Sequence, residues 1–126
     1  MKLYAPNSYY EASDEEKLEV CNGCGAKDGV KVPDTMWGLN ISEACNIHDW
    51  MFEEGITLAD FYFANAVFIM NLSIIIVCGG SKWLAPLRLM RATKYFVAVQ
   101  RLGEDAYWVD NKRNERMNIT YKGSFR

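Results

Sequence analysis

The sequence predicts a mainly α-helical domain, and three observations support this prediction. Apolar side chains recur every three to four residues through much of the chain, which is the period of an amphipathic helix. Residues that favour helix N-caps precede these segments. Glycines follow two of them, at Gly55 and at Gly79–Gly80. At 126 residues, the chain (1–126) is expected to be a single domain with its own core.

The first helix is expected at about residues 14–20, where Ser13 and Glu16 have the spacing of a capping box. Residues 21–39 are rich in Gly, Lys, Asp and Pro. This composition predicts an irregular but ordered loop between the first helix and the second.

The second helix is expected at about residues 41–54. Asn40 is its predicted N-cap, Glu43 completes a capping box, and Gly55 ends the helix. One apolar stripe of this helix carries Ile41, Cys45, His48 and Phe52.

A long third helix is expected to begin at Thr57, with Asp60 in a capping box, and to run to Cys78. Residues 61–78 are the most apolar part of the chain and approach the length of a bilayer span. Polar side chains interrupt them and no basic residue flanks their start, which favours a central core helix. Cys78 is predicted to be a buried free thiol, with a disulfide to Cys21 as the alternative.

A fourth helix is expected at about residues 83–102, and the tail beyond it is predicted to hold a short strand near residues 117–121. The apolar side chains of this helix are predicted to face the core: Trp83, Leu84, Leu87, Met90, Ala98 and Leu102. Its basic side chains are predicted to face solvent: Arg88, Arg91, Lys94 and Arg101.

Charge is distributed unevenly along the chain. Residues 1–60 hold 12 acidic and 4 basic residues, whereas residues 61–126 hold 4 acidic and 10 basic ones. Two solvated faces of opposite sign explain this pattern most simply, and the basic half also suits an anionic surface. The first ten residues lack the apolar region of a signal peptide, so none is visible.

The only histidine of the chain, His48, is followed directly by a carboxylate, Asp49. A buried imidazole needs a hydrogen-bond partner. If the second and third helices form an antiparallel hairpin, a rise of about 1.5 Å per residue places Asn65 level with His48. We therefore expect a hydrogen bond between His48 and Asn65, while Asp49 points about 100° further round the helix.

The cysteines allow two interpretations of this region. Cys21 and Cys24 have the spacing of a zinc half-site, and so do Cys45 and His48. Three thiolates and one imidazole are a known structural zinc set, which predicts a zinc-stabilised interaction domain. Zinc would, however, leave Asp49 without a role, so this interpretation is the alternative.

The second interpretation pairs Cys24 with Cys45 in a disulfide, which would hold the glycine-containing loop against the histidine helix. Carbonyl oxygens of the loop would then lie near Asp49. Carbonyl and carboxylate oxygens are the ligands that calcium prefers. Gly23 and Gly25 would allow several carbonyls to converge.

These motifs resemble a known family. The pattern ACxxHD at residues 44–49, after NGC at residues 22–24, resembles the active-site helix of secreted phospholipase A2, most of all its small bacterial and phage-associated branch. Residues 65–71 (NxxFxxN) are similar to that branch's DxxFxx(D/N) helix. The resemblance covers about residues 20–75, and implies an antiparallel helix pair with an irregular Gly-rich calcium loop.

The resemblance implies a role for each matching residue. His48 would be the general base that takes a proton from the water attacking an ester carbonyl. Asp49 and loop oxygens of Asn22, Gly23 and Gly25 would bind calcium. Calcium and the backbone N–H of Gly25 would stabilise the oxyanion.

Two positions next to His48 differ from the family pattern. Asn65 stands where the family normally has an aspartate, so it would orient the imidazole as a catalytic partner without stabilising its positive form. Phe52 lacks the hydroxyl of the tyrosine found in the family. These differences predict that turnover is slow if catalysis is retained.

The resemblance thus implies calcium-dependent hydrolysis of a phospholipid acyl ester, and a secreted or phage-associated protein. The implied partner is a phospholipid or membrane surface, and no nucleic acid is expected. The alternative within the same fold is a non-catalytic module that binds lipid or protein.

Overall fold

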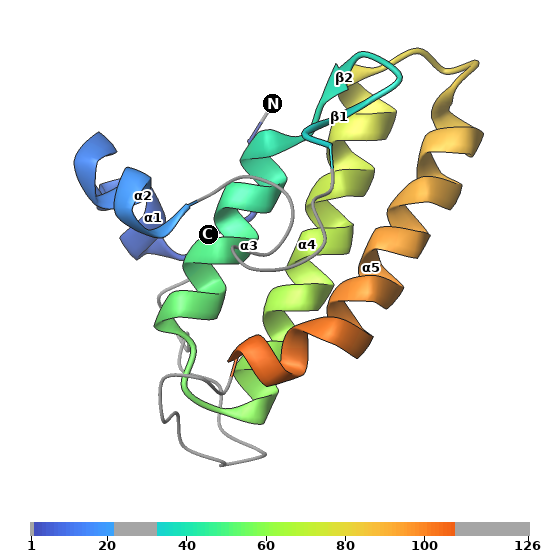
Figure 1. Cartoon of the computed structure of the whole chain (residues 1–126). Coiled ribbons are helices and arrows are strands. Elements are labelled where there is room, and N and C mark those ends of the chain that lie inside the picture. Colours follow the sequence, from blue (N-terminus) through green and yellow to red (C-terminus); the bar gives the residue numbers. More distant parts are fainter. Residues whose placement is uncertain (1, 22–32, 108–126) are drawn as a thin grey trace.

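The structure is a computed structural model of the chain, in which residues 2–21 and 33–107 are described, residues 102–107 by their backbone alone. Within these ranges the protein is mainly α-helical, as predicted, with five helices and one two-stranded sheet (Figure 1). The predicted strand near residues 117–121 lies outside the described residues. The elements are α1 (Asn7–Glu11), α2 (Asp14–Val20), β1 (Thr35–Met36), β2 (Leu39–Asn40), α3 (Ser42–Glu54), α4 (Leu58–Gly79) and α5 (Ala85–Tyr107).

Helices α3, α4 and α5 lie side by side with α4 in the middle, and α1 and α2 lie on the far side of α3 (Figure 1). The core fills the space between these helices. Its fully buried side chains include Ile41, Ile47, Met51, Phe61, Val67, Leu72 and Ile76. The bounds of α3 and α4 were predicted nearly correctly, whereas α5 begins two residues later and ends five residues later than predicted, and α1 was not predicted.

The turn between α3 and α4 is fixed by the predicted capping box. The hydroxyl of Thr57 accepts a hydrogen bond from the Asp60 N–H at 3.1 Å, and the Asp60 carboxylate accepts one from the Thr57 N–H at 3.1 Å. The same carboxylate also accepts from the N–H of Ile56 at 2.9 Å. Gly55 ends α3, as predicted. This short, bonded turn sets the register of α3 against α4.

The N-terminus of α3 differs from the prediction. Its N-cap is Ile41, which makes no side-chain capping bond, because Asn40 belongs to strand β2. The Asn40 amide oxygen instead accepts from the N–H of Ser42 at 2.8 Å. Glu43 does not complete a capping box, since its carboxylate accepts a hydrogen bond from the Tyr9 hydroxyl at 3.0 Å.

The predicted irregular loop is wrong at its end, where β1 and β2 form an antiparallel hairpin that pairs Met36 with Leu39. Trp37 and Gly38 form its two-residue turn with φ angles of 46° and 84°. Positive φ at two consecutive residues is typical of hairpin turns but costs energy at a tryptophan. Arg88 stabilises this turn by donating to the carbonyl oxygens of Met36 at 3.0 Å and Trp37 at 2.6 Å.

The predicted orientation of α5 is wrong for its first half. Arg88, predicted to face solvent, is 5% exposed, whereas Trp83 is 83%, Met90 63% and Leu87 50% exposed. The hydrogen bonds from Arg88 to the hairpin turn account for this, because they turn the arginine inward and the neighbouring apolar side chains outward. Arg91, Lys94 and Arg101 are exposed as predicted.

Among the described residues, one helix, α4, is long and apolar enough to cross a membrane. Half of its most apolar window is buried inside the protein, and core helices pass the same test. Its packing between α3 and α5 agrees with the predicted core helix. Cys78 near its end is a free thiol, as predicted, but it is exposed rather than buried.

Candidate functional site

His48 lies on the buried stripe of α3 and is 7% exposed. Two phenylalanine rings pack against its imidazole. The ring centroid of Phe52 lies 4.2 Å away and that of Phe68, on α4, lies 4.6 Å away. The imidazole is therefore largely shielded from water.

The predicted hydrogen bond between His48 and Asn65 is confirmed. Nε2 of His48 lies 2.7 Å from Oδ1 of Asn65, which is fully buried on α4. An amide oxygen can only accept, so Nε2 carries the proton in this arrangement. The predicted register of the α3–α4 hairpin is therefore correct.

A third residue, Gln100 of α5, completes this network. The side-chain amide of Asn65 donates from Nδ2 to Oε1 of Gln100. This bond directs the oxygen of Asn65 toward His48, because the amide nitrogen is already engaged. Sequence analysis missed Gln100, since a single glutamine within a helix carries no spacing that pairs it with a residue 35 positions earlier.

Burial controls the acid–base behaviour of His48. It lowers the pKa of the imidazole from 6.5 to about 4, because the charged form loses its hydration, and the hydrogen bond that His48 donates to Asn65 opposes this only in part. At neutral pH, His48 is therefore uncharged and available to accept a proton, although it is a weak base.

Asp49 is half-buried on α3 and lies near the end of α2. Burial, together with the nearby charges of Asp49 and Glu43, raises the pKa of the Cys21 thiol to about 11. The thiol of Cys21 also donates to the carbonyl oxygen of Asn46 at 3.2 Å. This hydrogen bond holds the end of α2 against the turn of α3 that carries Asp49.

The other predicted calcium ligands, Asn22, Gly23 and Gly25, lie outside the described residues, and so does Cys24. Cys45 is disulfide-bonded, whereas Cys21 and Cys78 are free. The pairing of Cys45 with Cys24 involves a residue outside the described ranges and stays a prediction.

The zinc interpretation predicted that Cys21, Cys45 and His48 converge with Cys24. Within residues 2–21 and 33–107, no group of three His, Cys, Asp or Glu side chains has the arrangement of a metal site. A disulfide-bonded Cys45 also has no thiolate to offer. The three described residues therefore do not support zinc.

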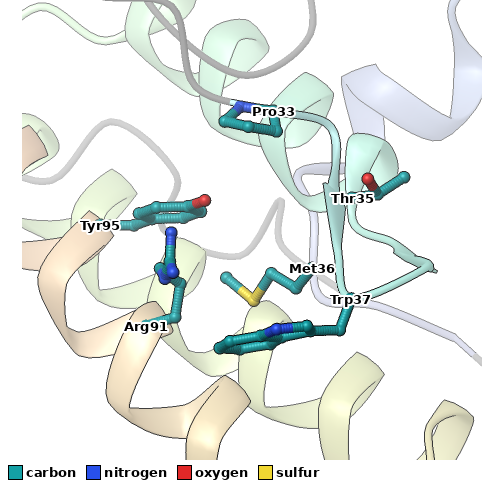
Figure 2. A pocket seen from close by; sticks show the side chains of 6 residues that line it. All are labelled: Pro33, Thr35, Met36, Trp37, Arg91 and Tyr95. Atoms are coloured by element: carbon teal, nitrogen blue, oxygen red, sulfur yellow. The ribbon is translucent and has the colours of Figure 1, made fainter.

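A small pocket lies apart from His48, between the β-hairpin and α5 (Figure 2). Its volume is about 130 Å³, which is small for a binding site of a drug-sized molecule. Its lining residues are Pro33, Thr35, Met36, Trp37, Arg91 and Tyr95.

Comparison of the chain with protein-family models, curated proteins and solved structures finds no match.

Proposed function

We propose that the chain is a phospholipase A2-like hydrolase that cleaves an acyl ester of a phospholipid slowly and in a calcium-dependent manner. The observation that carries this proposal is the 2.7 Å bond between His48 and Asn65, with Asp49 next to the histidine on α3. Asn65 on α4 orients the imidazole of His48 on α3, and the carboxylate of Asp49 follows His48 directly in the sequence.

The imidazole of His48 acts as the general base. Because Nε2 donates its proton to Asn65, Nδ1 is the nitrogen that can accept a proton from an attacking water. Asn65 keeps the ring in this tautomer but cannot stabilise the imidazolium as a carboxylate would. The low pKa of His48, about 4, also limits its strength as a base. Slow turnover follows from both properties.

Calcium, when bound, supplies positive charge that stabilises the oxyanion of the transition state. Asp49 is suited to bind it, because its half-buried carboxylate lies close to the end of α2. Oxygen atoms of Asn22, Gly23 and Gly25 are the proposed further ligands, with the backbone N–H of Gly25 as a second oxyanion donor.

The test is release of fatty acid from dispersed phospholipid by the purified protein, with calcium and with a chelator. His48→Gln removes the base and Asp49→Asn removes the charged ligand, so each should abolish release. Glu53→Gln is the matched control, because it neutralises an exposed carboxylate on the same helix and should retain activity. Equal activity in all four proteins, or activity independent of calcium, would contradict the proposal.

The second candidate function is a non-catalytic module of the same fold that binds lipid or protein. The packing of Phe52 and Phe68 against His48 favours it, because a shielded imidazole of low pKa is a poor base. Calcium binding without hydrolysis of any phospholipid would support this function over the first.

A further inference from the structure

The outer face of α5 exposes large apolar side chains next to basic ones. We define this face by Trp83, Leu87, Met90, Arg91 and Lys94, all of which are exposed. Trp83 lies in the turn before α5, and Leu87, Met90, Arg91 and Lys94 follow at helical spacing on one side of the helix. The face therefore carries three apolar side chains, followed along the chain by two basic ones.

A second tryptophan extends this face onto the β-hairpin. The guanidinium of Arg91 lies 5.2 Å from the centre of the Trp37 ring, which is half exposed (Figure 2). At the other end, the ammonium of Lys82 lies 5.8 Å from the ring of Trp83. Trp37 and Trp83 thus each have a cationic side chain beside the ring.

The charged side chains of α5 and of the turn before it are all basic up to Glu104, whereas the hairpin carries one exposed acidic residue, Asp34, directly before β1. The sequence contains no acidic residue between Asp60 and Glu104, whereas Lys82, Arg91 and Lys94 are exposed there. A second copy of the same face would be repelled by its like charges, which argues against self-association through it.

We propose that the outer face of α5 docks onto an anionic phospholipid bilayer. Tryptophan rings favour the headgroup level, and exposed aliphatic side chains such as Leu87 and Met90 gain free energy on entering the acyl boundary. The basic side chains attract anionic headgroups. A nucleic acid would satisfy the charges but would leave the aliphatic side chains in water.

The proposed docking face and the proposed catalytic network occupy different parts of α5. Leu87 precedes Gln100 by thirteen residues, which is about 20 Å along α5 at the usual helical rise. Lys94, the last residue of the face, precedes Gln100 by six residues, or about 9 Å, so the docking face lies on the N-terminal side of the network of His48, Asn65 and Gln100. The proposed docking does not require catalysis, and His48→Gln should bind membranes as well as the wild type.

The test is co-sedimentation of the full chain with vesicles of phosphatidylcholine alone and of an equimolar mixture with phosphatidylglycerol. We expect binding to the anionic vesicles, little binding to the neutral ones, and a marked loss of binding at high salt. A blue shift of tryptophan fluorescence on binding should decrease in Trp83→Ala and in Trp37→Ala, and largely disappear when both tryptophans are replaced.

The double variant Leu87→Ser with Lys94→Glu should bind roughly tenfold or more weakly, since one apolar contact and one cation are lost. The matched control is Leu18→Ser with Lys2→Glu, which changes an exposed leucine and an exposed lysine elsewhere and should retain binding. Circular dichroism checks that both double variants fold. Equal binding by both, no binding to anionic vesicles, or preferential binding to DNA would overturn the proposal.

Discussion

His48 combines a buried position, a single polar partner on Nε2 and two aromatic neighbours, and these determine its charge. The folded pKa of about 4 lies below the ordinary value of 6.5, so the unfolded chain binds more protons between these pH values. The contribution of His48 to the free energy of unfolding is therefore greatest above about pH 6.5, and it falls as the pH drops toward 4.

This loss should amount to roughly 3 kcal/mol at most. Urea unfolding of the wild type and of His48→Gln at a series of pH values isolates it, because the other titrating groups are common to both proteins. The free energy of unfolding of the wild type should fall more steeply between pH 6.5 and 4. Parallel curves would show that the imidazole is not buried in its neutral form.

Replacing Asn65 by aspartate should raise the pKa of His48 by a unit or more, because a carboxylate stabilises the imidazolium. Proton NMR titration measures this directly, since the chain has only one histidine. The same variant should raise the rate of fatty acid release under the proposed function. An unchanged pKa would show that the aspartate side chain does not reach the ring.

Gln100 should control the tautomer of His48 through Asn65. In Gln100→Leu the amide nitrogen of Asn65 loses its acceptor, so the amide is free to turn its nitrogen toward His48. The ¹⁵N shifts of the imidazole should then indicate more protonation at Nδ1. Gln100→Glu keeps the acceptor and should keep Nε2 protonated. Identical ¹⁵N shifts in all three proteins would exclude this role.

At the scale of secondary structure elements, the close approach of α4, α5 and the β-hairpin depends on a glycine. A Cβ atom at Gly80 would lie 2.8 Å from Nη1 of Arg88 and 3.2 Å from the carbonyl oxygen of Ile76. The backbone of Gly80 is extended, so the lack of a side chain, rather than a special φ angle, is what the structure requires.

Gly80→Ala should therefore destabilise the protein by about 1–3 kcal/mol, since Arg88 must move and its bonds to the hairpin turn weaken. Gly38→Ala provides the comparison, because its cost comes from a positive φ angle with no atom within 4 Å of the new Cβ. Urea unfolding measures both. An unchanged midpoint in Gly80→Ala would show that Arg88 is free to shift.

The elements whose bounds depend on local chemistry could be predicted from the sequence. The Thr57–Asp60 box and Gly55 fixed the turn between α3 and α4, and this register was enough to predict the His48–Asn65 bond. The prediction of Asn40 as the N-cap of α3 was wrong, because Asn40 pairs in the β-hairpin and the helix begins after it.

The remaining features depend on contacts between distant parts of the chain. The Trp37–Gly38 turn carries a bulky residue at positive φ and lacks the usual asparagine or aspartate, so its sequence did not indicate a hairpin. The inward position of Arg88 depends on that turn. The hydrogen bond between Gln100 and Asn65 likewise depends on how α5 packs against α4.

At the scale of the whole molecule, the three long helices carry two regions of different chemistry. Helices α3, α4 and α5 each contribute one residue to the network of His48, Asn65 and Gln100. The outer face of α5 and the hairpin turn carry the exposed tryptophans and cations. The first region is the proposed site of hydrolysis and the second is the proposed lipid-docking face.

The central claim is hydrolysis, and the most direct measurement is mass-spectrometric detection of fatty acid and lysophospholipid from phospholipid vesicles incubated with the wild-type chain. We expect both products to accumulate in equal amounts in the presence of calcium and neither to form in the presence of a chelator. No product in calcium from either neutral or anionic vesicles, with the protein folded, would contradict it.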